Sequence, residues 1–217
     1  MEKLFIMTVG TSLITGTFRL TRPQKDAVMD ESLSPVPVTP AAQQVLNLYA
    51  EKLRDDHTPF LDTAEFWTMR AYQRTLHPDS DQRFTPGARY VFVVTDTYVA
   101  RWVVQMFREI ITTHYPTIRI ETDIVVPGLT VGMPLAFDTA QMELNQHLNR
   151  LTDPYVAAGC ADDVIFNASG GFKFISGWVH TYATMRGHRV LYLYEGSREI
   201  LMTKPRIAGD FPAPLFI

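Results

Sequence analysis

Several short segments of the chain are continuously apolar and end at a glycine or a polar loop. Residues 4–9 form the first such run and stop at Gly10, and residues 90–94 and 164–166 repeat the pattern. Strands buried on both faces of a parallel sheet have unbroken apolar runs rather than alternating ones. The pattern therefore predicts central parallel strands at these three places.

Helical spacing follows each predicted strand. Apolar residues recur at three- and four-residue intervals after residues 90–94, which predicts an amphipathic helix from about 98 to 114. A second helix, with Asp138 as its N-cap, is expected to follow a third strand over residues 118–126 that Pro127 and Gly128 close. A third helix begins after residues 167–171 and stops at Gly187. The expected apolar positions of the last two helices are Met142, Leu144, Leu148, Leu151, Ile175, Trp178, Val179 and Tyr182.

Residues 190–194 and 200–202 complete the predicted sheet, the second as an antiparallel edge strand after a turn at residues 196–197. Repeated strand-helix-strand units imply a mainly parallel sheet with helices on both faces. We therefore expect a doubly wound, Rossmann-like α/β fold in a single domain spanning residues 1–217.

Residues 15–89 interrupt this plain pattern, because one crossover needs far fewer residues. A proline-rich stretch at 32–40 should be extended, whereas residues 41–54 and 62–76 have helical apolar spacing, for example Val45, Leu48, Tyr49 and Leu53. A lid or dimer-facing arm and a plain surface elaboration are both compatible with this insertion.

Composition narrows the class of protein. The chain of 217 residues is 46% hydrophobic and 20% charged, as globular proteins are, and lacks an apolar run of roughly eighteen residues that would span a membrane. No secretory signal is expected at the N-terminus, and Cys160, the single cysteine, cannot form an intramolecular disulfide. Both expectations favour the cytoplasm. A net charge of −3 argues against long nucleic acids and for a small ligand.

Metal chemistry is not expected. The six histidines lack metal-binding spacing, and one cysteine cannot build a thiolate zinc site. We predict no metal and no cofactor, and we interpret Cys160 as inert. The pairs Arg70 with His77 and Arg108 with His114 have a loose spacing like that of helical RNases, which we interpret as coincidence.

Two glycine-containing loops are the candidates for chemistry. The first loop, Gly10, Thr11 and Ser12, offers backbone amides and two hydroxyls suited to phosphate or ribose oxygens, although such glycines are also common in purely structural turns. The second loop, residues 167–173, opens a helix with a double glycine and places Lys173 in its first turn. A cation there opposes the helix dipole, which is easier to understand if an anion binds beside it.

These motifs resemble those of the CRISPR-associated Rossmann-fold (CARF) domains, which bind cyclic oligoadenylates made by type III interference complexes. The first loop is similar to that family's Gly-Thr-Ser motif and the second to its Asn/Asp-x-Thr/Ser-Gly-Gly-x-Lys motif. The resemblance spans nearly the whole chain outside residues 15–89. It implies a ligand site built from Gly10, Thr11, Thr95, Asp96, Thr97, Asn167, Ser169, Gly170, Gly171 and Phe172 around Ser12 and Lys173.

The resemblance implies a stand-alone homodimer that is a metal-independent ring nuclease, in which Lys173 stabilises charge and Ser12 orients the reacting groups. Cleavage by attack of a 2′-hydroxyl leaves a 2′,3′-cyclic phosphate. The tetra-adenylate is the expected ring, with the hexa-adenylate as the alternative. The alternative is a non-catalytic sensor that acts through a separate partner. A nucleotide-dependent metabolic enzyme is disfavoured, because its glycine fingerprints are missing.

Three residues of this site have competing interpretations. Asp96 either pairs with an adenine amino group or caps the following helix, and the cap is favoured. For Phe172, contact with an adenine is the less favoured interpretation. For His180, a histidine that is packed or solvated on its helix is favoured over one that faces the ligand.

Overall fold

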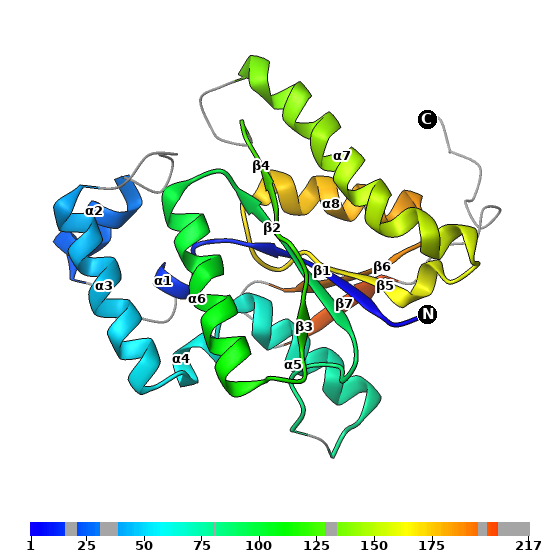
Figure 1. Cartoon of the computed structure of the whole chain (residues 1–217), viewed down its shortest axis with the longest axis horizontal. Coiled ribbons are helices and arrows are strands. Elements are labelled where there is room, and N and C mark those ends of the chain that lie inside the picture. Colours follow the sequence, from blue (N-terminus) through cyan, green and yellow to red (C-terminus); the bar gives the residue numbers. More distant parts are fainter. Residues whose placement is uncertain (16–20, 31–38, 80, 129–133, 195–198, 204–217) are drawn as a thin grey trace, which may run out of the picture.

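The computed structural model describes residues 1–15, 21–30, 39–79, 81–128, 134–194 and 199–203. Its described strands form one seven-stranded sheet in the order β3-β2-β1-β5-β6-β7, with β4 also paired to β2 (Figure 1). All pairs are parallel except β6 with β7. The predicted doubly wound α/β fold is confirmed.

The elements have the following bounds. The strands are β1 Leu4–Val9, β2 Arg89–Thr95, β3 Arg119–Ile120, β4 Ile124–Val126, β5 Val164–Asn167, β6 Arg189–Leu193 and β7 Ile200–Thr203. The α-helices are α1 Ser12–Thr15, α2 Arg22–Asp30, α3 Pro40–Asp55, α4 Thr58–Leu61, α5 Ala64–Leu76, α6 Tyr98–His114, α7 Pro134–Ala157 and α8 Lys173–Met185.

Side chains of the central strands alternate between two buried layers. Phe5 of β1 pairs in register with Tyr90 of β2, and their rings stack with centroids 4.9 Å apart in the layer beneath α3, α5 and α6. Ile6 points to the opposite layer, beneath α7 and α8. Burial on both sides explains the unbroken apolar runs of β1 and β2.

The segment 15–89 supplies part of the helical layer. Phe66, Met69 and Tyr72 of α5 are fully buried, and α5 packs against β1, β5, β6 and β7. Figure 1 shows α2 and α3 beyond α6, at the outer side of the same layer. A plain surface elaboration is therefore the wrong description of α5, which covers the sheet. The helices at 41–54 and 62–76 are confirmed as α3 and α5, whereas α2 and α4 were not expected.

The region 118–126 differs from the single strand expected there. It contains two short strands, β3 and β4, because the guanidinium of Arg108 binds Asp123 at 2.7 and 2.9 Å and also the carbonyl of Glu121. Between the two strands the Glu121 amide still donates to the Tyr90 carbonyl of β2 at 2.8 Å, whereas the Glu121 carbonyl and the Asp123 carboxylate accept from Arg108.

Asp138 is not an N-cap, because α7 begins at Pro134, a residue suited to the first turn of a helix. Leu144 and Leu148 are buried as expected, but Met142 and Leu48 are exposed. Gly187 has a φ of 73° and follows the last residues of α8, which confirms the predicted stop. The expected turn at 196–197 and most of the proline-rich stretch lie outside the described residues.

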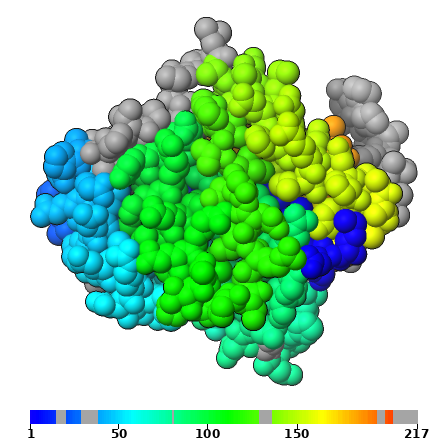
Figure 2. Space-filling model, in the orientation of Figure 1, coloured from blue at the N-terminus to red at the C-terminus, as the bar shows by residue number. Residues whose placement is uncertain are grey.

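One face of the molecule is drawn in Figure 2, where the residues of α6 and of β3 and β4 spread across the centre, between α3 and α7. Among the described helices, none combines the length and the apolar character needed to cross a membrane.

Candidate functional site

The two predicted loops leave the sheet side by side. Strands β1 and β5 are parallel neighbours, with Met7 opposite Asn167, so the first loop after β1 and the second loop after β5 emerge at the same edge. The chain runs from β1 toward β2 on one side, and from β5 toward β6 on the other. This is the topological switch point, where ligands bind in open α/β sheets.

Glycines bring the loops into backbone contact. A Cβ on Gly10 would lie 2.5 Å from the amide nitrogen of Gly171, and Gly171 has a φ of 88°, a conformation that other residues rarely adopt. Thr8 of β1 and Ser176 of α8 fix the second loop, because both hydroxyls donate to the carbonyl of Gly170, at 2.5 and 2.7 Å. The close approach therefore explains why both loops need glycine.

A buried acid joins the two loops. Glu65 of α5 is fully buried, and its carboxylate oxygens accept the amide of Gly10 at 3.1 Å and the hydroxyl of Ser12 at 2.5 Å. Burial raises the pKa of this carboxyl above its usual range, against the opposing effect of those hydrogen bonds. Ser12 thus lies in the expected loop, with its hydroxyl engaged by a residue that no motif marked.

Asn167 and Ser169 serve the loop itself. The Asn167 side chain is buried; its amide donates to the backbone carbonyl of Glu65 at 2.7 Å and its oxygen accepts the Ser169 amide at 3.2 Å. The Ser169 hydroxyl accepts from Thr68 at 2.7 Å and from the amide of Leu193 at 2.9 Å. These contacts fix the loop to α5 and to the end of β6.

A cavity of about 310 Å³ opens beside the second loop. Its lining includes Lys173 at the start of α8, Ser176 and His180 along that helix, and Tyr192 of β6. The N-terminus of α8 brings amide donors and the positive end of its dipole to this place. The combination of an ammonium group and amides suits a phosphate, and His180 lies on the same wall.

An aromatic side chain other than Phe172 stands on the cavity wall. Phe172 is the N-cap residue of α8 and is not among the described residues that line the cavity. Tyr192 does line it and is partly exposed, 36%. Sequence reasoning missed Tyr192 because its strand looked uniformly apolar.

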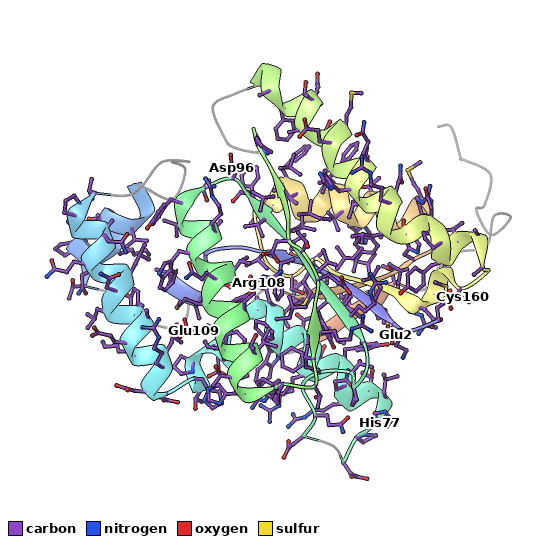
Figure 3. The ribbon with its side chains drawn as sticks, viewed as in Figure 1. Glu2, His77, Asp96, Arg108, Glu109 and Cys160 are labelled. Carbon is purple, nitrogen blue, oxygen red and sulfur yellow. The ribbon has the colours of Figure 1, made fainter. Side chains whose placement is uncertain are left out.

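Thr95 is the last residue of β2, and Asp96 and Thr97 follow it at the same sheet edge, but none of the three is among the described residues that line the cavity. Thr97, not Asp96, caps α6: its side chain accepts the amide of Ala100 at 3.3 Å. Asp96 pairs with Arg101 at 3.0 Å instead, at the start of α6 (Figure 3). The expectation that Asp96 caps the helix is therefore wrong.

The other candidate residues lie elsewhere. Figure 3 shows His77 at the end of α5, Arg108 on α6 and Cys160 after α7. Arg108 is committed to Asp123, and the Cys160 thiol donates to the carbonyl of Ala158 at 3.5 Å. Within the described residues, no three His, Cys, Asp or Glu side chains gather as a metal site would require.

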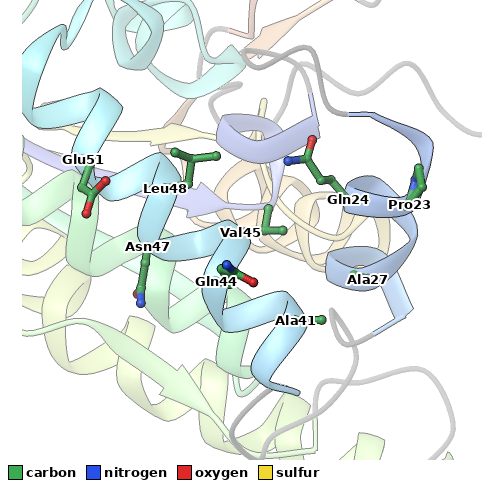
Figure 4. A pocket seen from close by; sticks show the side chains of 9 residues that line it. All are labelled: Pro23, Gln24, Ala27, Ala41, Gln44, Val45, Asn47, Leu48 and Glu51. Carbon is green, nitrogen blue, oxygen red and sulfur yellow. The ribbon is translucent and has the colours of Figure 1, made fainter.

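A larger hollow of about 620 Å³ lies between α2 and α3 (Figure 4). Among its described lining residues the only ionisable group is the carboxylate of Glu51; the others are apolar or amide side chains such as Leu48, Gln24 and Asn47. Because an acidic wall repels phosphate, the smaller cavity beside Lys173 is the better candidate for an anionic ligand.

A family model described as CRISPR-associated protein (Cas_APE2256) matches residues 63–206, which is more than half of the chain. The matched region begins just before α5 and includes Glu65, the second loop, α8 and β6, whereas the first loop precedes it. No curated protein matches the chain.

Proposed function

Because the chain belongs to the CRISPR-associated protein family Cas_APE2256, we propose that it is a metal-independent ring nuclease that binds and cleaves cyclic oligoadenylate. The tetra-adenylate is the proposed ring, and its destruction would switch off type III CRISPR signalling. The observation that carries this proposal is the cavity in which Lys173, Ser176 and the start of α8 converge beside the two contacting loops.

The proposed reaction is an internal transesterification. A ribose 2′-oxygen bonds to the neighbouring phosphorus, the bond from phosphorus to the 5′-oxygen breaks, the 2′-hydroxyl loses its proton and the 5′-oxygen gains one. The product is an opened chain with a 2′,3′-cyclic phosphate and a 5′-hydroxyl. No water and no oxidant are consumed.

The protein contributes positioning and charge stabilisation to this reaction. The Lys173 ammonium and the amides of Gly170 and Gly171 stabilise negative charge on the non-bridging phosphate oxygens. Ser12 orients the 2′-hydroxyl or the phosphate and forms no covalent bond. Tyr192 offers the face of its aromatic ring, on which an adenine stacks.

The proposed enzyme is a homodimer, because one cavity is too small to hold the whole ring. About 310 Å³ is at the lower end of small-molecule pockets, roughly 300–1,000 Å³, and too small for a ring of four nucleotides. A tetra-adenylate ring has two-fold symmetry, so two copies of this site across a dimer axis would each hold one half.

The test is incubation of the pure protein with cyclic tetra-adenylate and cyclic hexa-adenylate in EDTA, with products separated by chromatography. We expect opened products that carry a 2′,3′-cyclic phosphate. Rings that stay intact but bound would favour the non-catalytic sensor, and a protein that binds neither ring would overturn both functions.

A further inference from the structure

Glu65 has an unusual position for an acid. It lies in the first turn of α5, with no exposed surface, on the same helix stripe as the buried residues Thr68 and Met69. Its side chain binds the first loop through Gly10 and Ser12, and its backbone carbonyl binds the second through Asn167. One residue of the 15–89 segment therefore contacts both loops.

The surroundings of this carboxyl disfavour its charged form. The groups described around it are the amide of Gly10, the hydroxyls of Ser12 and Thr63, and the close backbone of Gly170, none of which carries a charge. Asn167 is also neutral, and Lys173 is the first titratable residue along the second loop. Neutral donors offset only part of the free energy lost when a carboxylate leaves water, and burial accordingly raises the pKa of Glu65.

We propose that Glu65 is a positioning residue that sets the direction of the Ser12 hydroxyl proton. When the carboxyl is ionised, both oxygens accept, and the Ser12 proton is committed to Oε2 at 2.5 Å. When Oε2 carries a proton, that proton is donated to Ser12 Oγ, and the Ser12 hydroxyl donates outward instead. The inference rests on the proposed function for the identity of the outward acceptor, a phosphate oxygen of the ring.

The protonated carboxyl is the competent state. It removes a negative charge from beside a loop that must approach a phosphodiester, and it makes Ser12 a donor to that group. Ring cleavage should therefore fall as the pH rises through the pKa of Glu65. Glutamine copies the protonated carboxyl, since its amide nitrogen donates to Ser12 Oγ while its oxygen accepts from Gly10.

The first experiment measures ring cleavage by wild type and Glu65→Gln over a range of pH. We expect equal rates at low pH and a ratio of variant to wild type that rises about tenfold per pH unit above the pKa of Glu65, as for loss of one proton. A purely structural role would give a ratio independent of pH, and that result would overturn the proposal. Glu65→Ala, which leaves both donors without their acceptor, should be slower than Glu65→Gln throughout.

The second experiment needs no ligand. Infrared difference spectra of wild type against Glu65→Gln should contain the carbonyl band of a protonated carboxylic acid at a pH above the ordinary pKa of a glutamate, where an exposed glutamate is ionised. Ser12→Ala should shift that band, since it removes the hydrogen-bond partner. A missing band, or one that Ser12→Ala leaves unchanged, would overturn the inference. If wild type cleaves no ring, the proposed function fails and this spectrum alone decides the role of Glu65.

Discussion

A Cβ on Gly170 would lie 2.1 Å from Oε1 of Glu65, closer than any real pair of such atoms. The residue after Ser169 must therefore be glycine for as long as the acid occupies its place.

Gly170→Ala should destabilise the protein, because the extra methyl forces Glu65 or the second loop to move. Overpacking of this kind costs about 1–3 kcal/mol in the free energy of unfolding, measured by denaturant titration. Gly177→Ala is the matched control, since a Cβ there meets nothing within 4 Å and lies inside α8. It should stabilise by about 0.5–1 kcal/mol through helix propensity. Equal effects at the two glycines would contradict the crowding at Glu65.

Lys173→Ala should lower the rate of ring cleavage about 100- to 1,000-fold, the loss typical when one charge-stabilising donor is removed. Lys173→Arg, which keeps the charge but not the geometry, should retain part of the rate. Single-turnover kinetics with cyclic tetra-adenylate measure both. Lys52→Ala, on the exposed surface of α3, removes the same charge elsewhere and should leave the rate unchanged. Turnover by Lys173→Ala near the wild-type rate would remove Lys173 from the site.

Tyr192→Ala should weaken binding of cyclic tetra-adenylate by about 1–3 kcal/mol, the stacking energy of one base on one aromatic ring. Tyr192→Phe keeps the ring and should bind nearly as well. Phe172→Ala is the informative comparison, because Phe172 is an aromatic residue of the second loop that lies outside the described cavity lining. Calorimetric titration measures all three, and a larger loss at Phe172 than at Tyr192 would reverse the assignment of the stacking residue.

His188 should make stability depend on pH. Burial lowers its pKa, while the hydrogen bond of Nδ1 with the carbonyl of Ala161 at 2.9 Å opposes the change. The unfolded chain therefore takes up a proton below the ordinary value of 6.5 while the folded chain does not, and stability falls as the pH decreases through that value. His188→Phe should flatten this decline in melting temperature between neutral and mildly acidic pH. An identical decline in both proteins would exclude His188 as its source.

Much of the fold was predictable because a strand that is buried on both faces of the sheet has an unbroken apolar run, which is visible in the sequence. Residues 4–9 and 90–94 are unbroken apolar runs for that reason, and the helix over 98–114 was predicted to its ends because one face is apolar, although its cap is Thr97 and not Asp96. The division of 118–126 into two strands was not predictable, since it depends on Arg108, which arrives from a neighbouring helix.

The two loops were predictable from their glycines and hydroxyl side chains, because each group of such residues lies together in one short stretch of the sequence. Glu65 was missed, although an acid on the apolar stripe of residues 62–76 was a visible signal. Its importance comes from Gly10 and Ser12, which are more than fifty positions away in the chain. Tyr192 was missed because only the three-dimensional sheet reveals that its side of β6 borders a cavity.

The contribution of α5 has a consequence for protein design. A graft that carried only the two glycine loops to another α/β scaffold would transfer the hydroxyl of Ser12 and the amide of Gly10 without their acceptor, the Glu65 carboxylate. It would also remove the contacts of Asn167 with the Glu65 carbonyl and of Ser169 with Thr68. A transplantable unit must therefore include α5 and the end of β6, whose Leu193 amide binds Ser169, in addition to the two loops.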